Sequence, residues 1–143
     1  MPSRPIAILG AGNVGIALAG ALVARGEHVV FGVPNPDKYR AAVAALGPPA
    51  SIGRSEEAID AAELVVLATP YSAALEIARS VADWNGRILV DATNPLAPGL
   101  AGLLVGTTTS GAEQIAAAAR GARVVKAFNT TGAENMADSR YPG

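Results

Sequence analysis

The stretch Gly10-Ala11-Gly12-Asn13-Val14-Gly15 decides the fold, because it joins a short apolar run to a long Ala-rich segment. Ile6 to Leu9 precedes it as an expected strand, and residues 13–25 follow as an expected helix that ends at Gly26. The first glycine permits a tight bend, the second lets backbone approach a diphosphate, and the third lets helix and strand pack closely. The helix start adds free N–H groups and the positive end of a dipole. The stretch therefore predicts a dinucleotide-binding turn.

The same alternation of short apolar runs and longer helical segments continues along the chain. Further strands are expected at residues 28–31, 50–52, 64–68, 87–91 and 123–128, and further helices at residues 35–46, 55–61, 70–81 and 110–120. Asn35 and Ser55 are the expected N-caps of two of these helices. Strands that alternate with helices form parallel sheets. The sequence predicts an α/β fold, a Rossmann-type doubly wound parallel sheet of order 3-2-1-4-5-6, in one dinucleotide-binding domain over residues 1–143.

The composition fits one globular domain and excludes several classes of function. Half of the 143 residues are apolar and 16% are charged, which favours a buried core over disorder. The formal net charge is −1 and no basic run is present, so the electrostatic footprint of a nucleic-acid binder is missing. The chain has no cysteine, which excludes disulfides, thiolate metal sites and a cysteine nucleophile.

The N-terminal region also shares features with a signal peptide or a membrane span, since Arg4 is followed by the largely apolar residues 6–24. That stretch carries Asn13 and four glycines at the spacing of a turn, and no second long apolar segment follows. We therefore expect a cytoplasmic protein that does not insert into a membrane and whose partners are small-molecule cofactors.

The end of the second expected strand bears on which dinucleotide binds. NAD sites normally have an acid there to hold the ribose diol, but this chain reads Val33-Pro34-Asn35 and has no acid before Asp37. A 2′-phosphate would meet no repulsion, and Lys38 and Arg40 lie on the next turn. The pattern favours NADP(H) over NAD. In the alternative interpretation, the two basic residues form only a solvated helix face.

Three further segments follow expected strands, where open α/β sheets bind ligands. They are residues 68–71, 91–95 and 126–131, and their hydroxyls, amides and aromatic rings would frame ribose and nicotinamide. Ordinary turn and cap roles remain the alternative for Asp91, Asn94 and Asn129. For Tyr71, packing in the core or at its rim remains the alternative to cofactor contact.

Few side chains suggest acid–base, nucleophilic or metal chemistry. His28 is the only histidine and is expected at the surface or a sheet edge, and no spacing of His, Cys or carboxylates suggests a metal site. The acidic residues within 56–63 fit a solvated helix face, and Trp84 is expected to pack beside the strand at residues 87–91. We name no catalytic residue.

The strings GAGNVG, FGVPNPDKY, VVLATPYSA, ILVDATNPL, SGAEQIA and VVKAFNTTGAENM together resemble the F420-dependent NADP oxidoreductase family over nearly the whole chain. The dinucleotide-binding module of the STEAP metalloreductases is a similar match. The resemblance implies a Rossmann domain in which hydride passes between NADP and the deazaflavin F420 or a flavin. It also implies that residues 11–14 hold the pyrophosphate and that Lys38 approaches the 2′-phosphate. The residues implied at the nicotinamide end are Thr69, Pro70, Tyr71, Asn94 and Asn129.

Two departures limit what the resemblance implies. The family often has Ser-Arg or Asn-Arg directly after the glycine of the second strand, where this chain has Val33-Pro34, so NAD use stays open. Family members also continue past the position of Gly143, in a portion that helps build the second-cofactor pocket and the dimer. The F420 or flavin site is therefore expected to be incomplete in residues 1–143, and assembly into a homodimer stays open.

The sequence thus favours an NADP(H)-binding oxidoreductase domain that exchanges hydride with F420 or a flavin. The alternatives are a non-catalytic NAD(P)-binding module, sensor or fragment of a larger reductase, and an imine or carbonyl reductase, which would need a helical substrate domain. The candidate cofactor-binding residues are Gly10, Ala11, Gly12, Asn13, Val14, Gly15, Val33, Asn35, Lys38, Ala68, Thr69, Pro70, Tyr71, Asn94, Pro95 and Asn129.

Overall fold

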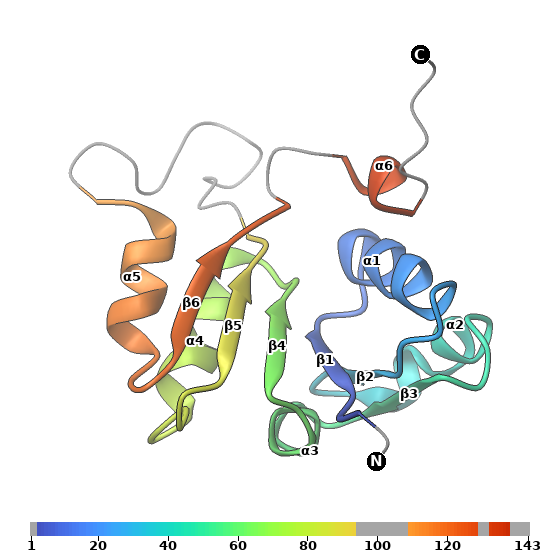
Figure 1. The fold of residues 1–143 in the computed structure, drawn as a ribbon, viewed down its shortest axis with the longest axis horizontal. Helices are drawn as coiled ribbons and strands as arrows, with labels where there is room; N and C mark the ends of the chain where they lie inside the picture. The colour runs from blue at the N-terminus through green and yellow to red at the C-terminus, as the bar shows by residue number, and fades with distance from the viewer. Residues whose placement is uncertain (1–2, 94–108, 129–131, 138–143) are drawn as a thin grey trace.

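The described strands of the computed structural model run parallel in one sheet, in the order β3-β2-β1-β4-β5-β6 (Figure 1). The structure describes residues 3–93, 109–128 and 132–137. The strands are β1 (Ile6–Leu9), β2 (Val29–Gly32), β3 (Ala50–Gly53), β4 (Leu64–Leu67), β5 (Ile88–Asp91) and β6 (Arg123–Lys126). The helices are α1 (Asn13–Val23), the 3-10 helix η1 (Pro36–Lys38), α2 (Arg40–Ala44), α3 (Ser55–Ala61), α4 (Tyr71–Ser80), α5 (Gly111–Ala118) and α6 (Ala133–Ala137). The predicted fold class and strand order are confirmed.

The strand register brings the carboxyl ends of the strands to one edge of the sheet. Leu9 at the end of β1 pairs with Gly32 of β2 on one side and with Leu67 of β4 on the other. Leu67 in turn pairs with Asp91 of β5, and Asp91 pairs with Lys126 of β6. Residues that follow different strands are therefore neighbours at this edge, where a doubly wound sheet binds ligands.

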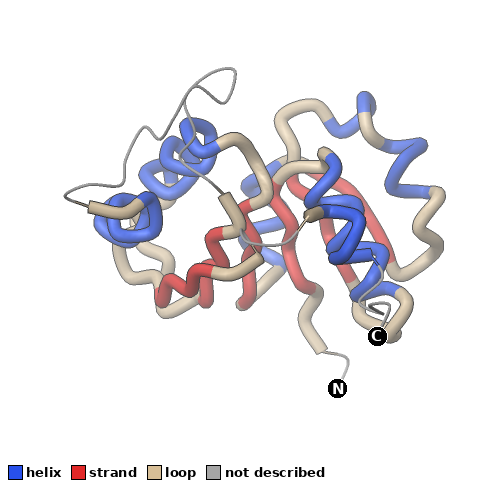
Figure 2. Tube along the Cα trace, turned by 90° about the horizontal axis from the view of Figure 1, so that it is seen from above, coloured by secondary structure: helices blue, strands red, loops and turns tan. Residues whose placement is uncertain are grey.

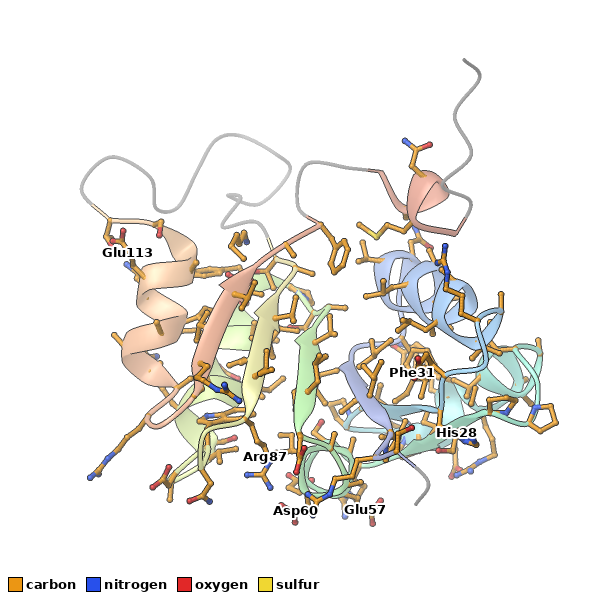
Figure 3. All side chains as sticks on the ribbon, in the orientation of Figure 1. His28, Phe31, Glu57, Asp60, Arg87 and Glu113 are labelled. Carbon is orange, nitrogen blue, oxygen red and sulfur yellow. The ribbon has the colours of Figure 1, made fainter. Side chains whose placement is uncertain are left out.

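Helices cover both faces of the sheet, as Figure 2 shows from above. Because successive residues of a strand point to opposite faces, the buried strand residues divide into two clusters. Phe31 and its neighbours pack against α1 and α2, and Figure 3 shows the Phe31 ring pointing from the sheet toward these helices. The other cluster, which includes Leu67 and Leu89, packs against α3, α4 and α5. Burial on both faces explains the nearly continuous apolar runs of the central strands.

The single helix predicted for residues 35–46 is wrong, since the structure divides it into η1 and α2. The Tyr39 N–H donates to the Pro36 carbonyl at 3.1 Å, a bond between residues three apart. Asp37 and Arg40 are also three apart, with Arg40 Nη2 2.8 Å from Asp37 Oδ1. The backbone bond fits three residues per turn, so this segment adopts a 3-10 turn before α2 begins.

One predicted helix cap is wrong. Ser55 is the first residue of α3, and Arg54 holds the cap position. The Arg54 N–H donates to the Glu57 carboxylate at 2.9 Å, so an acid in the first turn satisfies the helix start. Asn35 holds the predicted cap position before η1, but its side chain makes no capping hydrogen bond.

Other features of the fold agree with the sequence predictions. Trp84 is fully buried in the cluster that contains Leu89 of β5, and its indole N–H donates to the Ala78 carbonyl at 3.0 Å. His28 is exposed beside the start of β2, at the edge opposite the carboxyl ends (Figure 3). The acidic residues of α3 are exposed. Within the described residues, no helix combines the length and apolar character that crossing a membrane requires.

Candidate functional site

The glycine-rich turn after β1 is held tightly against the sheet. Gly10 adopts a φ of +102°, and a Cβ there would lie 2.9 Å from the Ala68 carbonyl carbon. The Gly10 N–H donates to the Gly32 carbonyl at 3.1 Å. A Cβ at Gly15 would overlap the Gly10 carbonyl oxygen. Gly10 and Gly15 thus have the bending and packing roles that the sequence predicts, because no other residue fits either space.

Gly12 differs from its two neighbours in the motif. It is exposed, and a Cβ built on it would have no heavy atom of the described residues within 4 Å, apart from its chain neighbours. Gly12 therefore faces open space, and its lack of a side chain leaves that space free for a ligand. No packing requirement of the protein itself explains this glycine.

The amino end of α1 begins directly after Gly12. Its first internal hydrogen bond runs from the Ile16 N–H to the Gly12 carbonyl at 2.9 Å, and no side chain caps the helix. The first turn of α1, which starts with Asn13 and Val14, contains no acidic residue. The early N–H groups and the positive end of the helix dipole are therefore available to an anion such as a diphosphate.

A cleft of about 420 Å³ lies beside this turn. Its walls come from the turn, the end of β2 and the two residues that follow it, the tyrosine after η1, the start of α3, and the segment from β4 into α4. The lining residues are Gly10, Ala11, Gly12, Gly32, Val33, Pro34, Tyr39, Ser55, Ala68, Thr69, Pro70, Ala73, Glu76 and Ile77. The structure therefore brings together seven of the predicted residues, Gly10, Ala11, Gly12, Val33, Ala68, Thr69 and Pro70, in one cavity.

The sequence interpretation missed the part of the cleft wall that α4 supplies. Ala73, Glu76 and Ile77 follow Pro70 at intervals of three, six and seven residues. Those intervals place the four residues on one face of a helix, so helical periodicity counted from Pro70 was a signal available in the sequence. Tyr39 was missed because the predicted unbroken helix over residues 35–46 gave it no special position.

Two basic side chains near the end of β2 differ in whether a carboxylate neutralises them. Arg40 is paired with Asp37, whereas the Lys38 ammonium lies over the Tyr39 ring, 5.3 Å from its centre. Tyr39 lines the cleft, but Lys38 and Asn35 are exposed and do not line it. Among the residues that the structure describes, no carboxylate forms a salt bridge with Lys38. Lys38 is thus a basic residue whose charge is available beside the cleft.

Tyr71 occupies a different environment from the cleft. Its side chain is 7% exposed and belongs to the core cluster on the α4 and α5 face. The Tyr71 hydroxyl donates to Gln114 Oε1 at 2.5 Å. Burial raises the pKa of the phenol, the Asp91 carboxylate raises it further, and the Arg79 guanidinium opposes both effects. This placement favours the packing role that the sequence left open for Tyr71.

Asp91 is a buried structural residue at the end of β5. Its Oδ1 accepts hydrogen bonds from the Thr93 N–H at 2.9 Å and from the Thr93 hydroxyl at 2.6 Å. Its Oδ2 lies 3.2 Å from Lys126 Nζ on β6. Because both carboxylate oxygens have protein partners, Asp91 has the turn and capping role that was one of the two interpretations of the sequence. The other candidates near this edge, Asn94, Pro95 and Asn129, lie outside the described residues.

Groups that would carry metal chemistry are missing from the part of the chain that the structure describes. No three His, Cys, Asp or Glu side chains there lie close enough together to hold a metal ion. The arrangement is instead suited to binding a ligand with an anionic centre at α1 and an apolar or aromatic portion along the cleft.

Comparison with known proteins identifies related sequences and folds. The model of the family described as NADP oxidoreductase coenzyme F420-dependent matches residues 5–95. The hypothetical protein SMa0349 from Sinorhizobium meliloti is 30% identical, with a TM-score of 0.85 over 94% of this chain and 65% of that one. A proposed F420-dependent NADP reductase from Arthrobacter sp. FB24 is 33% identical, with a TM-score of 0.77 over 95% of this chain and 67% of that one.

More distant structures share the fold. A 3-hydroxyisobutyrate dehydrogenase from Mycobacterium tuberculosis is 21% identical, with a TM-score of 0.72 over 94% of this chain and 43% of that one. An imine reductase from Aspergillus terreus, solved with NADPH4, is also 21% identical, with a TM-score of 0.67 over 88% of this chain and 41% of that one. The chain thus spans about two thirds of its nearer relatives and about two fifths of these more distant ones.

Proposed function

The chain belongs to the F420-dependent NADP oxidoreductase family, and from this premise we propose that it binds NADP(H) in the cleft and exchanges hydride with F420 or a flavin. The family and the neighbouring structures place the chain among NAD(P)-binding oxidoreductase domains of Rossmann type. The identity of the hydride partner and the preference for NADP are parts of the proposal.

The observation that carries the proposal is the open space in front of Gly12. The uncapped amino end of α1 and the exposed Gly12 face the same cleft, whose other wall is formed by the end of β2. A dinucleotide diphosphate fits this combination, because main-chain N–H groups approach it closely and the helix dipole favours its charge. Gly32 and Val33 then adjoin the adenosine ribose, and Thr69 and Pro70 adjoin the other half of the nucleotide.

A preference for NADP is supported by the charges around Tyr39. A carboxylate that would hold an NAD ribose is missing from the lining at the end of β2, and the free ammonium of Lys38 lies over the Tyr39 ring. Arg40 contributes less, because Asp37 already neutralises it. We therefore assign the contact with the 2′-phosphate to Lys38.

The proposed reaction requires positioning rather than acid–base catalysis. When bound, NADPH supplies the hydride and the deazaflavin or flavin accepts it, so no side chain has to move a proton in the transfer itself. Two acid–base groups near the carboxyl edge are already engaged, Asp91 with Lys126 and Tyr71 with Gln114. The protein's part is to orient the nicotinamide and exclude water.

The proposal is tested by mixing the protein with NADPH and, in separate reactions, F420 or FMN, while the absorbance of NADPH is followed. We expect the rate of NADPH consumption to be proportional to the protein concentration, with one acceptor molecule reduced for each NADPH oxidised. Binding of NADPH without consumption by either acceptor would favour a non-catalytic nucleotide-binding module.

A further inference from the structure

The cleft continues into a second groove between α3 and α4. This groove has a volume of about 490 Å³ and is lined by Ser55, Glu56, Ile59, Asp60, Glu76, Ile77, Ser80 and Val81. Three of these residues, Ser55, Glu76 and Ile77, also line the cleft beside the glycine turn. The two cavities therefore meet at a junction formed by Ser55, Glu76 and Ile77.

The junction lies where the purine of a bound nucleotide would end. This step rests on the proposed function, in which the diphosphate lies at Gly12 and the adenosine ribose at Gly32 and Val33. The remaining cleft wall runs along α4 toward Glu76 and Ile77. The C6 substituent is on the side of a purine away from the ribose, so it would point toward the junction.

Glu76 gives this junction a chemical preference. It is exposed on α4, and within residues 3–93, 109–128 and 132–137 neither a salt bridge nor a side-chain hydrogen bond engages its carboxylate. The other two junction residues offer a hydroxyl (Ser55) and an apolar chain (Ile77). An ionised carboxylate only accepts hydrogen bonds, so it favours an amino group and opposes a carbonyl oxygen.

We propose that Glu76 is a specificity-determining residue, whose carboxylate accepts a hydrogen bond from the exocyclic amine of adenine and discriminates against 6-oxopurine nucleotides. Glutamine at this position both donates and accepts, so it serves an amine and a carbonyl almost equally. The identity of one side chain on α4 thus sets the base preference, independently of the contacts to the diphosphate.

The test compares the affinities of NADPH and reduced nicotinamide hypoxanthine dinucleotide phosphate. The purine carries an amino group at C6 in NADPH and a carbonyl oxygen in the hypoxanthine nucleotide, whose adjacent N1 also carries a proton. We expect the hypoxanthine nucleotide to bind the wild type about fivefold to tenfold more weakly. Glu76→Gln should reduce that ratio to about twofold or less. Asp60→Asn is the control, since Asp60 is an acidic residue of the same groove on α3 that does not line the cleft (Figure 3). It should keep the wild-type ratio.

The outcomes separate this inference from the function on which it rests. If NADPH binds but the two nucleotides bind the wild type equally, or the ratio persists in Glu76→Gln, the role of Glu76 is wrong and the proposed function stands. If neither nucleotide binds, both fail. An equal loss of discrimination in Asp60→Asn would show that overall charge, rather than Glu76, sets the preference.

A nucleotide extended at the purine amine gives a second measurement of the same geometry. An aminoethyl group on that nitrogen leaves one N–H for Glu76 and directs a cation into the groove lined by Glu56 and Asp60. We expect this NADPH derivative to bind within about threefold of NADPH. A loss of a hundredfold or more, about 2.7 kcal/mol, would show that the junction is closed to the purine edge and would overturn the proposal.

Discussion

Lys126 and Asp91 form an ion pair across the last two strands of the sheet, with Lys126 Nζ 3.2 Å from Asp91 Oδ2. The Asp91 side chain is fully buried, and the Lys126 side chain is 30% exposed. The same ammonium also donates to the Thr93 carbonyl. The pair therefore joins the ends of β5 and β6 to the segment that leaves β5, at the edge where the cleft lies.

Lys126→Met should destabilise the fold, because it leaves a buried carboxylate without its cation. We expect the free energy of unfolding to fall by about 2 kcal/mol, less than for a fully buried pair because Lys126 is partly solvated. Urea unfolding measures this change. Lys38→Met is the matched control and should shift stability by less than about 0.5 kcal/mol. Equal losses in both variants would contradict the importance assigned to the pair.

Tyr71 should make stability fall at alkaline pH. Burial and the Asp91 carboxylate raise the pKa of the folded protein's phenol above its ordinary value of 10.0, so folding favours the protonated form. Its contribution is fully present below about pH 10 and is lost as pH rises through the folded pKa. Tyr71→Phe removes this contribution. Between about pH 9 and about pH 11, the variant should lose less unfolding free energy than the wild type; equal losses would rule out the raised pKa.

Lys38 and Arg40 should differ in their effects on the choice of nucleotide. Lys38→Met removes the free ammonium beside Tyr39, so NADPH affinity should fall about tenfold while NADH affinity stays within about twofold. Arg40→Met removes a charge that Asp37 already neutralises, so its effect on NADPH should be smaller. Titrations of both variants with both nucleotides measure this difference. A larger loss in Arg40→Met would exchange the roles assigned to the two residues.

Most of the fold could be predicted from the sequence, because its signals are local. The central strands are buried on both faces and therefore form apolar runs, and the motif glycines mark the turn where side chains do not fit. The break at Tyr39 shows in its backbone hydrogen bond to Pro36. The spacing of Asp37 and Arg40 also fits an α-helix. Sequence spacing alone did not distinguish the two kinds of helix.

The site could be predicted only in part, because some of its walls come from distant segments. The turn and the residues after β4 follow strands directly, so strand order places them together. Helical periodicity counted from Pro70 would have added Glu76 to the site, but Asp91 meets Lys126 from 35 residues away. That pairing depends on tertiary packing, which no local pattern records. Asp91 was consequently left between a ligand-binding and a structural role.

Gly15→Ala should destabilise the protein itself. The added Cβ would overlap the Gly10 carbonyl oxygen, so α1 would have to move away from the turn. We expect the unfolding free energy to fall by about 2 to 4 kcal/mol, as for other insertions into tightly packed positions. Thermal or urea unfolding without any nucleotide measures this effect. A variant as stable as the wild type would show that helix and turn are not in such close contact.

The central claim is that a dinucleotide diphosphate lies in the space before Gly12, and titration of wild type and Gly12→Ala with NADPH tests it most directly. The added Cβ approaches no other atom of the described residues within 4 Å, apart from its chain neighbours, so the variant should keep its stability to within about 1 kcal/mol, while its affinity for NADPH falls at least about tenfold. Saturable binding to the wild type and this loss in a folded variant are the predicted result. Equal affinity in the two proteins, or no association of NADPH with the folded wild type, would contradict the claim.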